Sequence, residues 1–503
     1  MKIPGKAKMN DGRNIETTKI IDTSSIQFPS MDFFIRIFAD KIFLVGGTIR
    51  DYLLYNTMEE NKDIDLIVID HSYEEIENKL KPFGKTNTVG KSFAVVKFSM
   101  DQVTFDISVP RTDKIKDQAL HGHKNFIIDY GPHITLEEDL QRRDFTCNSI
   151  AMRLIDRSIV DPFDGLTAIR EKKIIMTGPQ TFADDPLRVL RAARFASVHQ
   201  FTIDESIYIC AKDVPLHELS KERIVDELFR LLLESPQPSI GLNQYFKLTI
   251  LEKLFPTLYL STLTIQDSLF HPEKDEYGHH TVWHHTLLVL DIARKCCRLF
   301  NLDEEHSLAL LLGALFHDLG KATTTRWEFK RGRMTITSTY HDTRGADMTL
   351  ELLTDLKIET RKNFPLKQTV FNLVKNHLRL YELYRNRDEI GFKAISRLVK
   401  DMEDQDFLLM LLDFADRQSR EPSPLDFNSL DDIANWFVQQ KQIYNINKET
   451  IKPLILGRDL IPLGVSPGLQ MGQYLKQLYE LQLDGAFETK EEGLSIFANI
   501  RNQ

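Results

Sequence analysis

The stretch FLVGGTIRDYLLYNTMEENKDIDLIVID, residues 43–70, decides the first part of the fold. It opens on an apolar run, passes through Gly46 and Gly47 into a helical pattern, and returns in a second apolar run that begins at Asp63 and Asp65. This order predicts a strand, a glycine turn, a helix and a second strand. The unsatisfied amides at the start of such a helix suit phosphate oxygens.

The two aspartates of this stretch predict a metal site. Side chains alternate across a strand, so Asp63 and Asp65 point to the same face, where their charges repel unless a cation lies between them. Mg²⁺ is the natural choice beside substrate phosphates. Asp106 lies in a second strand-like run, VTFDISV, and could supply a third carboxylate to a two-metal site. The glycine turn fits neither a P-loop nor a dinucleotide-binding loop.

The bulk composition is that of an ordinary globular protein. With 503 residues, 42% hydrophobic and 27% charged, the chain should divide into about three or four units. It has no apolar run of transmembrane length and no signal-peptide core, and its four cysteines form neither a disulfide framework nor a zinc spacing. These features predict a cytoplasmic protein that does not enter a membrane.

The charge pattern predicts one basic face on an acidic protein. A net charge of −9 argues against nucleic-acid binding over the whole surface. Arg188, Arg191 and Arg194, however, follow one another at helical spacing. They favour a local polyanion-binding face.

The fold class changes along the chain. Residues 41–170 alternate strand-like runs with helical pieces, whereas long amphipathic helical patterns dominate from about residue 181. Proline-bearing linker candidates lie near 235–238, 271 and 421–425. We therefore predict an α+β protein with a small N-terminal α/β head and a long all-α body.

Several longer motifs make a family recognisable. QRRDFTCNSIAM (141–152), VDPFDGL (160–166) and ADDPLRVLRAARFA (183–196), taken with LVGGTIRD and KDIDL, resemble the class II tRNA nucleotidyltransferases and bacterial poly(A) polymerases. The segments ERIVDELFRLL and GRDLIPLGVSPGLQ are similar, more specifically, to bacterial CCA-adding enzymes. The resemblance covers about residues 40–503 in the same motif order.

The resemblance implies a polymerase-β-like nucleotidyltransferase head and a division of the rest of the chain. The expected parts are an N-terminal extension (1–35), the head (36–170), a helical neck and body that select the nucleotide and bind RNA (171–270), an HD domain (271–420) and a tRNA-binding helical tail (421–503).

The resemblance also implies roles for residues of the head. Gly46, Gly47 and Arg50 would hold the triphosphate, and Asp63 and Asp65 the catalytic Mg²⁺ ions, while the RNA 3′ hydroxyl attacks the α-phosphorus. Three further residues match the ribose-reading motif of the family: Arg143, Asp144 and Asn148. Here Ser149 follows the asparagine where the family usually has alanine.

Base selection is expected in the DDPLR stretch. We predict that Asp185 and Arg188 lie at i, i+3 on one helix face, where an acceptor and a forked donor can mimic the edge of a pairing base. In the family this protein template selects CTP and ATP, and Arg191 and Arg194 would extend the nucleotide-binding surface. The family has glutamate where this chain has Asp184.

A second constellation lies in the body. The segments WHHTLLVLD, GALFHDLGK and YHDTRGADM resemble the HD phosphohydrolase superfamily. The resemblance implies that four residues bind a divalent ion such as Ni²⁺ or Mn²⁺: His285, His317, Asp318 and Asp416. Two further candidate ligands are His341 and His377. Lys321 could neutralise a phosphate. Some family members hydrolyse cyclic phosphates and 2′-phosphates, and others keep the domain as a scaffold.

The leading hypothesis is therefore addition and repair of the tRNA 3′-terminal CCA from CTP and ATP, with possible HD phosphohydrolase activity. The expected partner is the tRNA acceptor stem and 3′ end, bound by a monomer or a homodimer. One alternative is a poly(A) polymerase or a specialist that adds only CC or only A. Another is an HD phosphohydrolase with an RNA-binding, nucleotidyltransferase-like head.

Overall fold

The computed structural model describes residues 26–28, 30–56, 64–88, 95–100, 103–115, 126–330, 332–420, 432–446 and 452–501. The chain forms two compact units, and the boundary lies inside one helix. Unit 1 comprises residues 1–188 and 202–210, and unit 2 comprises 189–201 and 211–503. None of the helices in the described ranges is long and apolar enough to cross a membrane.

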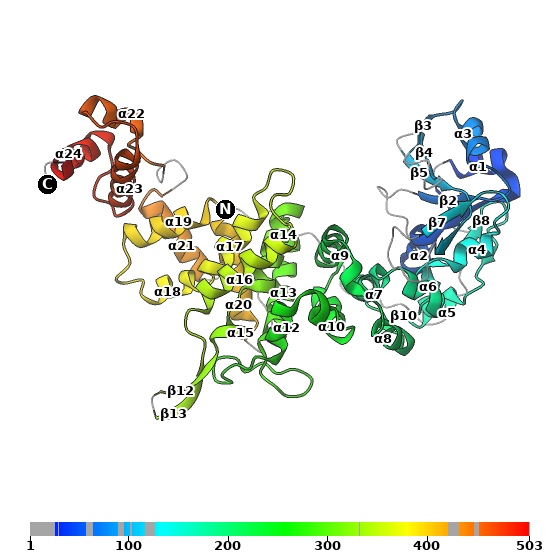
Figure 1. Ribbon diagram of the computed structural model, residues 1–503, viewed down its shortest axis with the longest axis horizontal. Helices are drawn as coiled ribbons and strands as arrows, with labels where there is room; N and C mark the ends of the chain where they lie inside the picture. Colours follow the sequence, from blue (N-terminus) through cyan, green and yellow to red (C-terminus); the bar gives the residue numbers. More distant parts are fainter. Residues whose placement is uncertain are drawn as a thin grey trace. The chain divides into compact units, whose positions relative to one another are not determined.

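Unit 1 is built on a mixed seven-stranded sheet in the order β3-β4-β5-β2-β1-β8-β9 (Figure 1). Its strands are β1 (Ile42–Val45), β2 (Ile64–Val68), β3 (Lys85–Thr88), β4 (Val95–Met100), β5 (Val103–Ser108), β8 (Ala151–Arg153) and β9 (Ile159–Val160). All four residues of β1 are buried, as expected for a central strand covered on both faces. The four strand-like runs of the sequence, in β1, β2, β4 and β5, are confirmed.

The helices of the head surround this sheet and a separate hairpin. They are α1 (Met31–Phe38), α2 (Gly46–Tyr55), α3 (Tyr73–Leu80), α4 (Leu136–Gln141), α5 (Gly165–Arg170) and α6 (Pro179–Asp184), and the hairpin pairs β6 (Arg111–Ile115) with β7 (Phe126–Tyr130). Rings of Phe34, Phe98 and Phe105 pack edge to face or tilted beneath α1. A small two-stranded sheet, β10 (Lys173–Ile174) with β11 (Thr202–Ile203), brings the returning segment back to unit 1.

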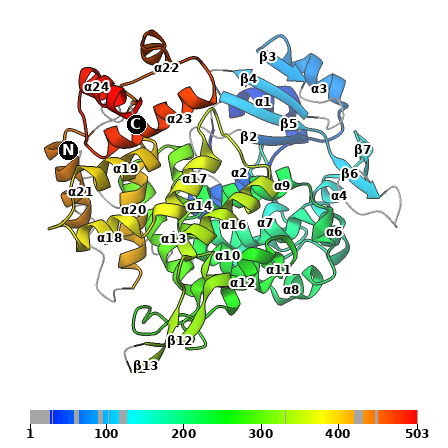
Figure 2. The same cartoon turned by 60° about the vertical axis from the view of Figure 1, so that its left-hand side comes forward.

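Unit 2 is almost entirely helical (Figures 1 and 2). Its helices are α9 (Lys221–Glu234), α10 (Pro238–Lys247), α11 (Ile250–Leu254), α12 (Pro256–Leu263), α13 (Val282–Leu299), α14 (Glu304–Phe316), α15 (Lys321–Thr324), α16 (His341–Asp355), α17 (Leu366–Asn376), α18 (Arg379–Arg385), α19 (Phe392–Met402), α20 (Asp406–Gln418), α21 (Asp432–Ile443), α22 (Gly457–Leu460), α23 (Leu469–Leu483) and α24 (Lys490–Arg501). Two helices lie at or across the boundary between the units, α7 (Leu187–His199) and α8 (Glu205–Ala211).

The core of unit 2 forms around α14. Every residue from Ser307 to Phe316 is buried, because α14 packs against α9, α13, α17 and α20. A helix that is apolar on all sides belongs in the middle of a bundle. The helices α22–α24 close over a smaller cluster of their own, which includes Leu460, Leu478 and Phe497. The prediction of a long helical body is confirmed, although its described residues include the short strands β10 and β11 and a hairpin of β12 (Arg326–Lys330) with β13 (Arg333–Thr337).

Candidate functional site

One edge of the head sheet gathers the motifs of the first constellation. Because β1 runs antiparallel to β2 and to β8, the end of β1 lies beside the beginnings of both other strands. Val45 pairs with Ala151, and Leu44 pairs with Leu66. The start of α2, Asp65 and the segment leading into β8 therefore meet at the same edge.

Two of the three predicted head carboxylates are neighbours. Asp65 on β2 and Asp106 on the parallel strand β5 are register partners, so their side chains share one face of the sheet. Lys97 Nζ lies 3.1 Å from Asp106 Oδ1. Asp63 falls outside the described residues, and its place at this edge stays a prediction. Paired carboxylate oxygens are suitable ligands for a hard divalent cation.

Gly46 allows the strand to turn directly into helix α2. Its φ is +68°, which favours glycine, and a Cβ there would lie 2.9 Å from Arg143 Nη1 and 3.4 Å from Asp65 Oδ2. A Cβ on Gly47 would stand 3.5 Å from Arg50 Nη2, an ordinary contact. The Asp65 amide donates to Thr48 Oγ1 at 3.2 Å, which ties the start of α2 to β2.

Arg50 joins the glycine motif to the predicted ribose-reading motif. Its side chain is buried; Nη1 donates to Asn148 Oδ1 at 2.6 Å and Nε to Asp51 Oδ1 at 2.8 Å. Asn148 Nδ2 in turn donates to Asp144 Oδ1 at 2.9 Å. The structure thus brings these predicted residues together in one buried network. A role of Arg50 at the triphosphate stays a prediction.

Asp139 positions the arginines of the RRD motif, and the sequence analysis missed it. This fully buried carboxylate accepts from Arg142 Nη2 at 2.7 Å, Arg143 Nη2 at 3.1 Å and the Arg111 amide at 3.1 Å. Burial alone would raise the pKa of Asp139, but the charges of Arg142 and Arg143 outweigh it and lower the pKa below its usual 3.8. The i, i+3 and i, i+4 spacing of EEDLQRRD was the available signal.

We expect Asp139→Asn to destabilise unit 1 by about 3 kcal/mol at pH 7, because two arginines lose a buried counter-charge. A carboxyl whose pKa is lowered by folding contributes stability above its unfolded pKa and loses it as the pH falls through the folded pKa. The free energy of unfolding of the wild type should therefore fall below about pH 4, and that of the variant should change less over the same pH range. Urea titrations at pH 7 and pH 3 measure both. If the free energy of unfolding fell equally with pH in both proteins, Asp139 would not be the buried counter-charge of the two arginines.

Asp185 and Arg188 do not share a helix face, which corrects the prediction. Helix α6 ends at Asp184 and α7 begins at Leu187, because a residue before proline disfavours the helical conformation. Asp185 is extended, and its Oδ1 accepts from the Leu187 amide at 3.1 Å. Arg188 donates to the carbonyls of Thr181 and Arg142. Arg188 is thereby fixed beside the RRD motif within unit 1.

Arg194 does not lie on an exposed basic face, which corrects that part of the prediction, and Arg191 is only partly exposed. The Arg194 side chain is 5% exposed, with Nε 2.7 Å from Glu227 Oε2 and Nη1 3.1 Å from Glu234 Oε2. These ion pairs join α7 to α9 within unit 2, and a role of Arg194 in nucleotide binding stays a prediction. Arg191 lies 3.6 Å from Glu227 and over the ring of Phe195.

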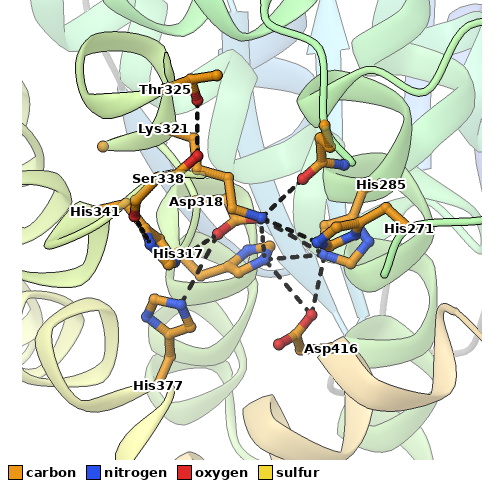
Figure 3. Close-up of polar contacts among 12 residues, drawn as sticks. His271, His285, His317, Asp318, Lys321, Thr325, Ser338, His341, His377 and Asp416 are labelled. Carbon is orange, nitrogen blue, oxygen red and sulfur yellow. Dashed lines mark hydrogen bonds and ion pairs between the residues drawn. The ribbon is translucent and has the colours of Figure 1, made fainter. Parts of the chain in front are cut away.

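The second constellation is a buried cluster in unit 2 (Figure 3). The structure brings all six predicted HD residues together from α13, the ends of α14 and α17, the start of α16, and α20: His285, His317, Asp318, His341, His377 and Asp416. Three groups of side chains there could each hold a metal ion: His271, Glu273 and His285; His285, His317 and Asp318; and Asp318, His341 and His377. Burying so many polar groups is costly unless they are compensated.

The imidazoles are oriented for coordination through Nε2. The Nδ1 atoms of His317, His341 and His377 lie 2.7–2.8 Å from the carbonyls of Ala314, Ser338 and Val374, respectively. A carbonyl can only accept, so each Nδ1 carries a proton, and each Nε2 is the nitrogen that would offer a lone pair to a metal ion. Burial and the neighbouring His341 and His317 lower the pKa of His377 to about 3, which keeps it neutral. These features are typical of metal-binding histidines.

Asp318 stands between the two halves of this cluster. Its Oδ1 lies 3.3 Å from His341 Nε2, and its Oδ2 lies 3.3 Å from His317 Nε2 and 2.7 Å from Lys321 Nζ. Burial would raise the pKa of Asp318, but the charges of Lys321 and His317 hold it well below its usual value. Asp416 Oδ1 contacts His285 Nε2 at 3.0 Å and the Arg420 guanidinium. The cluster therefore brings ionised carboxylate oxygens and imidazole nitrogens together.

Glu273 and His271 extend the cluster outward, and both were missed. Glu273 Oε1 lies 2.9 Å from His285 Nδ1 and 3.0 Å from His271 Nδ1. His271 Nε2 lies 3.2 Å from Lys321 Nζ, which also donates to Gln266 Oε1 at 2.7 Å. A carboxylate on the far nitrogen of a ligand histidine fixes its ring orientation. No spacing rule links a loop residue such as Glu273 to a histidine on the next helix.

Three families match the chain. Residues 42–175 match the Poly A polymerase head domain, 201–260 match the probable RNA and SrmB-binding site of polymerase A, and 282–421 match the HD domain. The multifunctional CCA protein of Stenotrophomonas maltophilia (strain R551-3) is 31% identical over 364 residues, which cover 71% of this chain and 80% of that protein. The chain belongs to the class II CCA-adding enzyme family.

A second relative and two solved structures agree with this membership. The multifunctional CCA protein of Pasteurella multocida (strain Pm70) is 35% identical over 293 residues, 57% of this chain and 64% of that protein. The Bacillus stearothermophilus CCA-adding enzyme in complex with CTP has a TM-score of 0.56 at 19% identity, covering 95% of this chain and 98% of that one. The Thermotoga maritima CCA-adding enzyme complexed with tRNA has a TM-score of 0.53 at 18% identity, covering 95% and 97%. These two structures show that the CCA-adding fold extends over nearly the whole chain.

Proposed function

We propose that the chain adds and repairs the 3′-terminal CCA of tRNA, using CTP and ATP and releasing pyrophosphate. The observation that carries the proposal is the single sheet edge at which the turn at Gly46, the Asp65–Asp106 pair and Arg143 meet. The multifunctional CCA proteins among the relatives support it.

In this proposal the head residues bind and orient the nucleotide. The amides after Gly46 receive the triphosphate, assisted by Arg50 and Arg143. A divalent ion, proposed to be Mg²⁺, would be held by Asp65, with Asp63 and Asp106, and would supply charge stabilisation to the phosphoryl group and the attacking hydroxyl. Asp144 and Asn148 read the ribose hydroxyls.

Base choice and RNA binding are assigned to the segments that follow. Arg188, fixed by carbonyls beside the RRD motif, and Asp185 form the proposed template for cytosine and adenine. We keep the predicted division into head (36–170), neck and body (171–270), HD domain (271–420) and tail (421–503). The match of residues 201–260 to a probable RNA-binding family supports tRNA binding by the body.

The test is a primer-extension assay with a tRNA that ends before its CCA. Each labelled nucleotide is supplied in turn and in combination. Incorporation of C, C and A followed by cessation is the expected result. Continued addition of A would support a poly(A) polymerase instead, and addition of C alone or A alone would support a specialist.

We propose a second function, metal-dependent hydrolysis of phosphate esters, for the HD cluster. The observation that favours it is the set of Nε2 atoms directed at Asp318 and Asp416. Mixed imidazole and carboxylate ligands suit Ni²⁺ or Mn²⁺ better than Mg²⁺. The two groups that share Asp318 provide places for two ions, which would supply an activated water to the phosphorus. Lys321 would neutralise charge on the phosphate.

We expect Glu273→Ala to weaken divalent-ion binding at this cluster about ten- to a hundredfold, because His285 loses the carboxylate that orients its ring. Hydrolysis at saturating metal should stay near the wild-type rate. Titration of the metal-depleted protein by calorimetry measures the affinity. Glu276→Ala is the matched control, since this exposed glutamate of the same loop pairs with Lys247. Equal affinities in both variants would refute the role of Glu273.

A further inference from the structure

In the described part of unit 2, β12 and β13 are the only named strands, and they form a hairpin. It extends away from the helices in both views (Figures 1 and 2). In the chain it lies between α15, which starts at Lys321, and α16, which starts at His341. Both of these residues contact Asp318. The hairpin is therefore an insertion between two residues of the HD cluster.

One face of this hairpin is apolar and exposed. Trp327 pairs with Ile336, and Phe329 pairs with Met334, so these four side chains share a face. Trp327 is 61% exposed, Phe329 is 70% exposed and Met334 is 53% exposed. Two adjacent exposed rings on a short ribbon bury no core, so their apolar area is available to a ligand.

The opposite face carries three cations and Glu328, and it anchors the hairpin. The side chains of Arg326, Lys330 and Arg333 are about half exposed or more; the first two pair with Glu328 and the third with Asp267. Thr335 Oγ1 donates to Asp267 Oδ2 at 2.6 Å, and the Ile336 amide donates to the same oxygen at 3.2 Å. Asp267 thus holds the hairpin in one orientation relative to the body.

The root of the hairpin is joined to a predicted metal ligand (Figure 3). The hydroxyls of Thr325 and Ser338 are 2.8 Å apart and close the root. The Ser338 carbonyl accepts from His341 Nδ1 at 2.7 Å, which orients the ring toward Asp318. A strand rises about 3.3 Å per residue, so Trp327 lies roughly 7 Å along the strand from Thr325 and Phe329 roughly 13 Å. Both rings therefore lie within roughly 13 Å of the root that contacts His341.

We propose that this hairpin is an arm that binds the single-stranded 3′ end of an RNA and presents its terminal phosphate ester to the HD cluster. The proposal rests on the hydrolytic function proposed above and names its substrate class, an oligoribonucleotide rather than a free mononucleotide. Aromatic rings stack on any base, and nearby cations follow the backbone. The surface of two five-residue strands is much smaller than the roughly 800 Å² that each partner buries in a stable protein interface. We therefore assign the hairpin to RNA rather than to a protein partner.

The kinetic test compares two substrates of the full-length wild type and its variants. The substrates are a short oligoribonucleotide ending in a 2′,3′-cyclic phosphate and 2′,3′-cyclic AMP. Replacing Trp327 and Phe329 together by leucine should raise KM for the oligonucleotide about tenfold or more and leave KM for the mononucleotide within about twofold. The matched control, Trp327→Phe with Phe329→Tyr, keeps the rings and should behave as wild type.

A binding test does not depend on hydrolysis. Trp327 is one of three tryptophans, and Trp283 is buried. Oligoribonucleotide added in the presence of EDTA should quench the fluorescence of wild type but not of Trp327→Phe. If the wild type hydrolyses neither substrate yet shows this quenching, the proposed hydrolytic function is wrong, but RNA binding by the hairpin is supported.

Two results would contradict RNA binding by this hairpin. One is an unchanged oligonucleotide KM in the leucine variant together with unchanged quenching. The other is a wild-type dimer in sedimentation that Trp327→Glu converts to a monomer with full RNA affinity, because the apolar face would then be an interface between two copies of the chain.

Discussion

Asp65→Asn should reduce the transfer of CMP and AMP to tRNA by about a thousandfold or more, corresponding to roughly 4 kcal/mol of transition-state stabilisation. Asp65 is partly exposed at the sheet edge beside Gly46 and in register with Asp106. The amide keeps the shape of the side chain but loses the negative charge that holds a divalent ion and its triphosphate. Single-turnover incorporation of labelled CMP into tRNA lacking CCA measures the loss.

A matched control lies beyond the other end of the same strand. Asp70 is exposed, pairs with Lys41 at 2.6 Å and has φ +58°, a conformation that asparagine also tolerates. Asp70→Asn should transfer nucleotides at the wild-type rate. The assignment of Asp65 would be wrong if the two variants were equally active, provided that both melt cooperatively near the wild-type temperature.

The sequence was sufficient for the elements of the head but not for how they pair. Apolar runs and the glycine pair predicted β1, α2 and β2 because local patterning governs each of these elements. That β5 pairs in parallel with β2, which makes Asp106 the neighbour of Asp65, is a long-range arrangement. No local pattern specifies strand order, so the third carboxylate could be predicted only as a candidate.

The errors at Asp185 and Arg194 have different physical causes. The prediction placed Asp185 and Arg188 on one continuous helix, although Pro186 lies between them and the helix is interrupted there. At Arg194, helical spacing was taken to mean an exposed basic face, whereas Glu227 on another helix buries the guanidinium. Spacing within one helix does not say which face the neighbouring helix covers.

The sequence predicted the residues of the HD cluster better than the residues around it. Family motif order predicted the six residues that the structure brings together, but the loop that supplies Glu273 and Gln266 lies outside the HD match, which begins at residue 282. The hairpin was missed although RWEFK and RMTIT each alternate apolar and polar residues around a glycine turn. Long helical patterns on both sides masked this short period-two signal.

Asp318→Asn should abolish hydrolysis by the HD cluster, a loss of about a thousandfold or more, and leave nucleotide transfer within about twofold. Its two oxygens serve both halves of the cluster, with Oδ1 facing His341 and Oδ2 facing His317. The amide cannot supply two anionic ligands, so the variant should also bind fewer divalent ions. Hydrolysis of 2′,3′-cyclic AMP and metal content by mass spectrometry measure the two effects.

Three points separate this result from simple unfolding. Lys321 keeps Gln266 Oε1 as an acceptor at 2.7 Å when the carboxylate is lost, so the buried ammonium is not left without a partner. Asp347→Asn, an exposed position on α16, controls for the change of charge and should retain both activities. Since the head has its own carboxylates in unit 1, tRNA extension reports whether the chain is still folded. Full hydrolysis by Asp318→Asn, or loss of both activities in a folded protein, would contradict a separate metal site in unit 2.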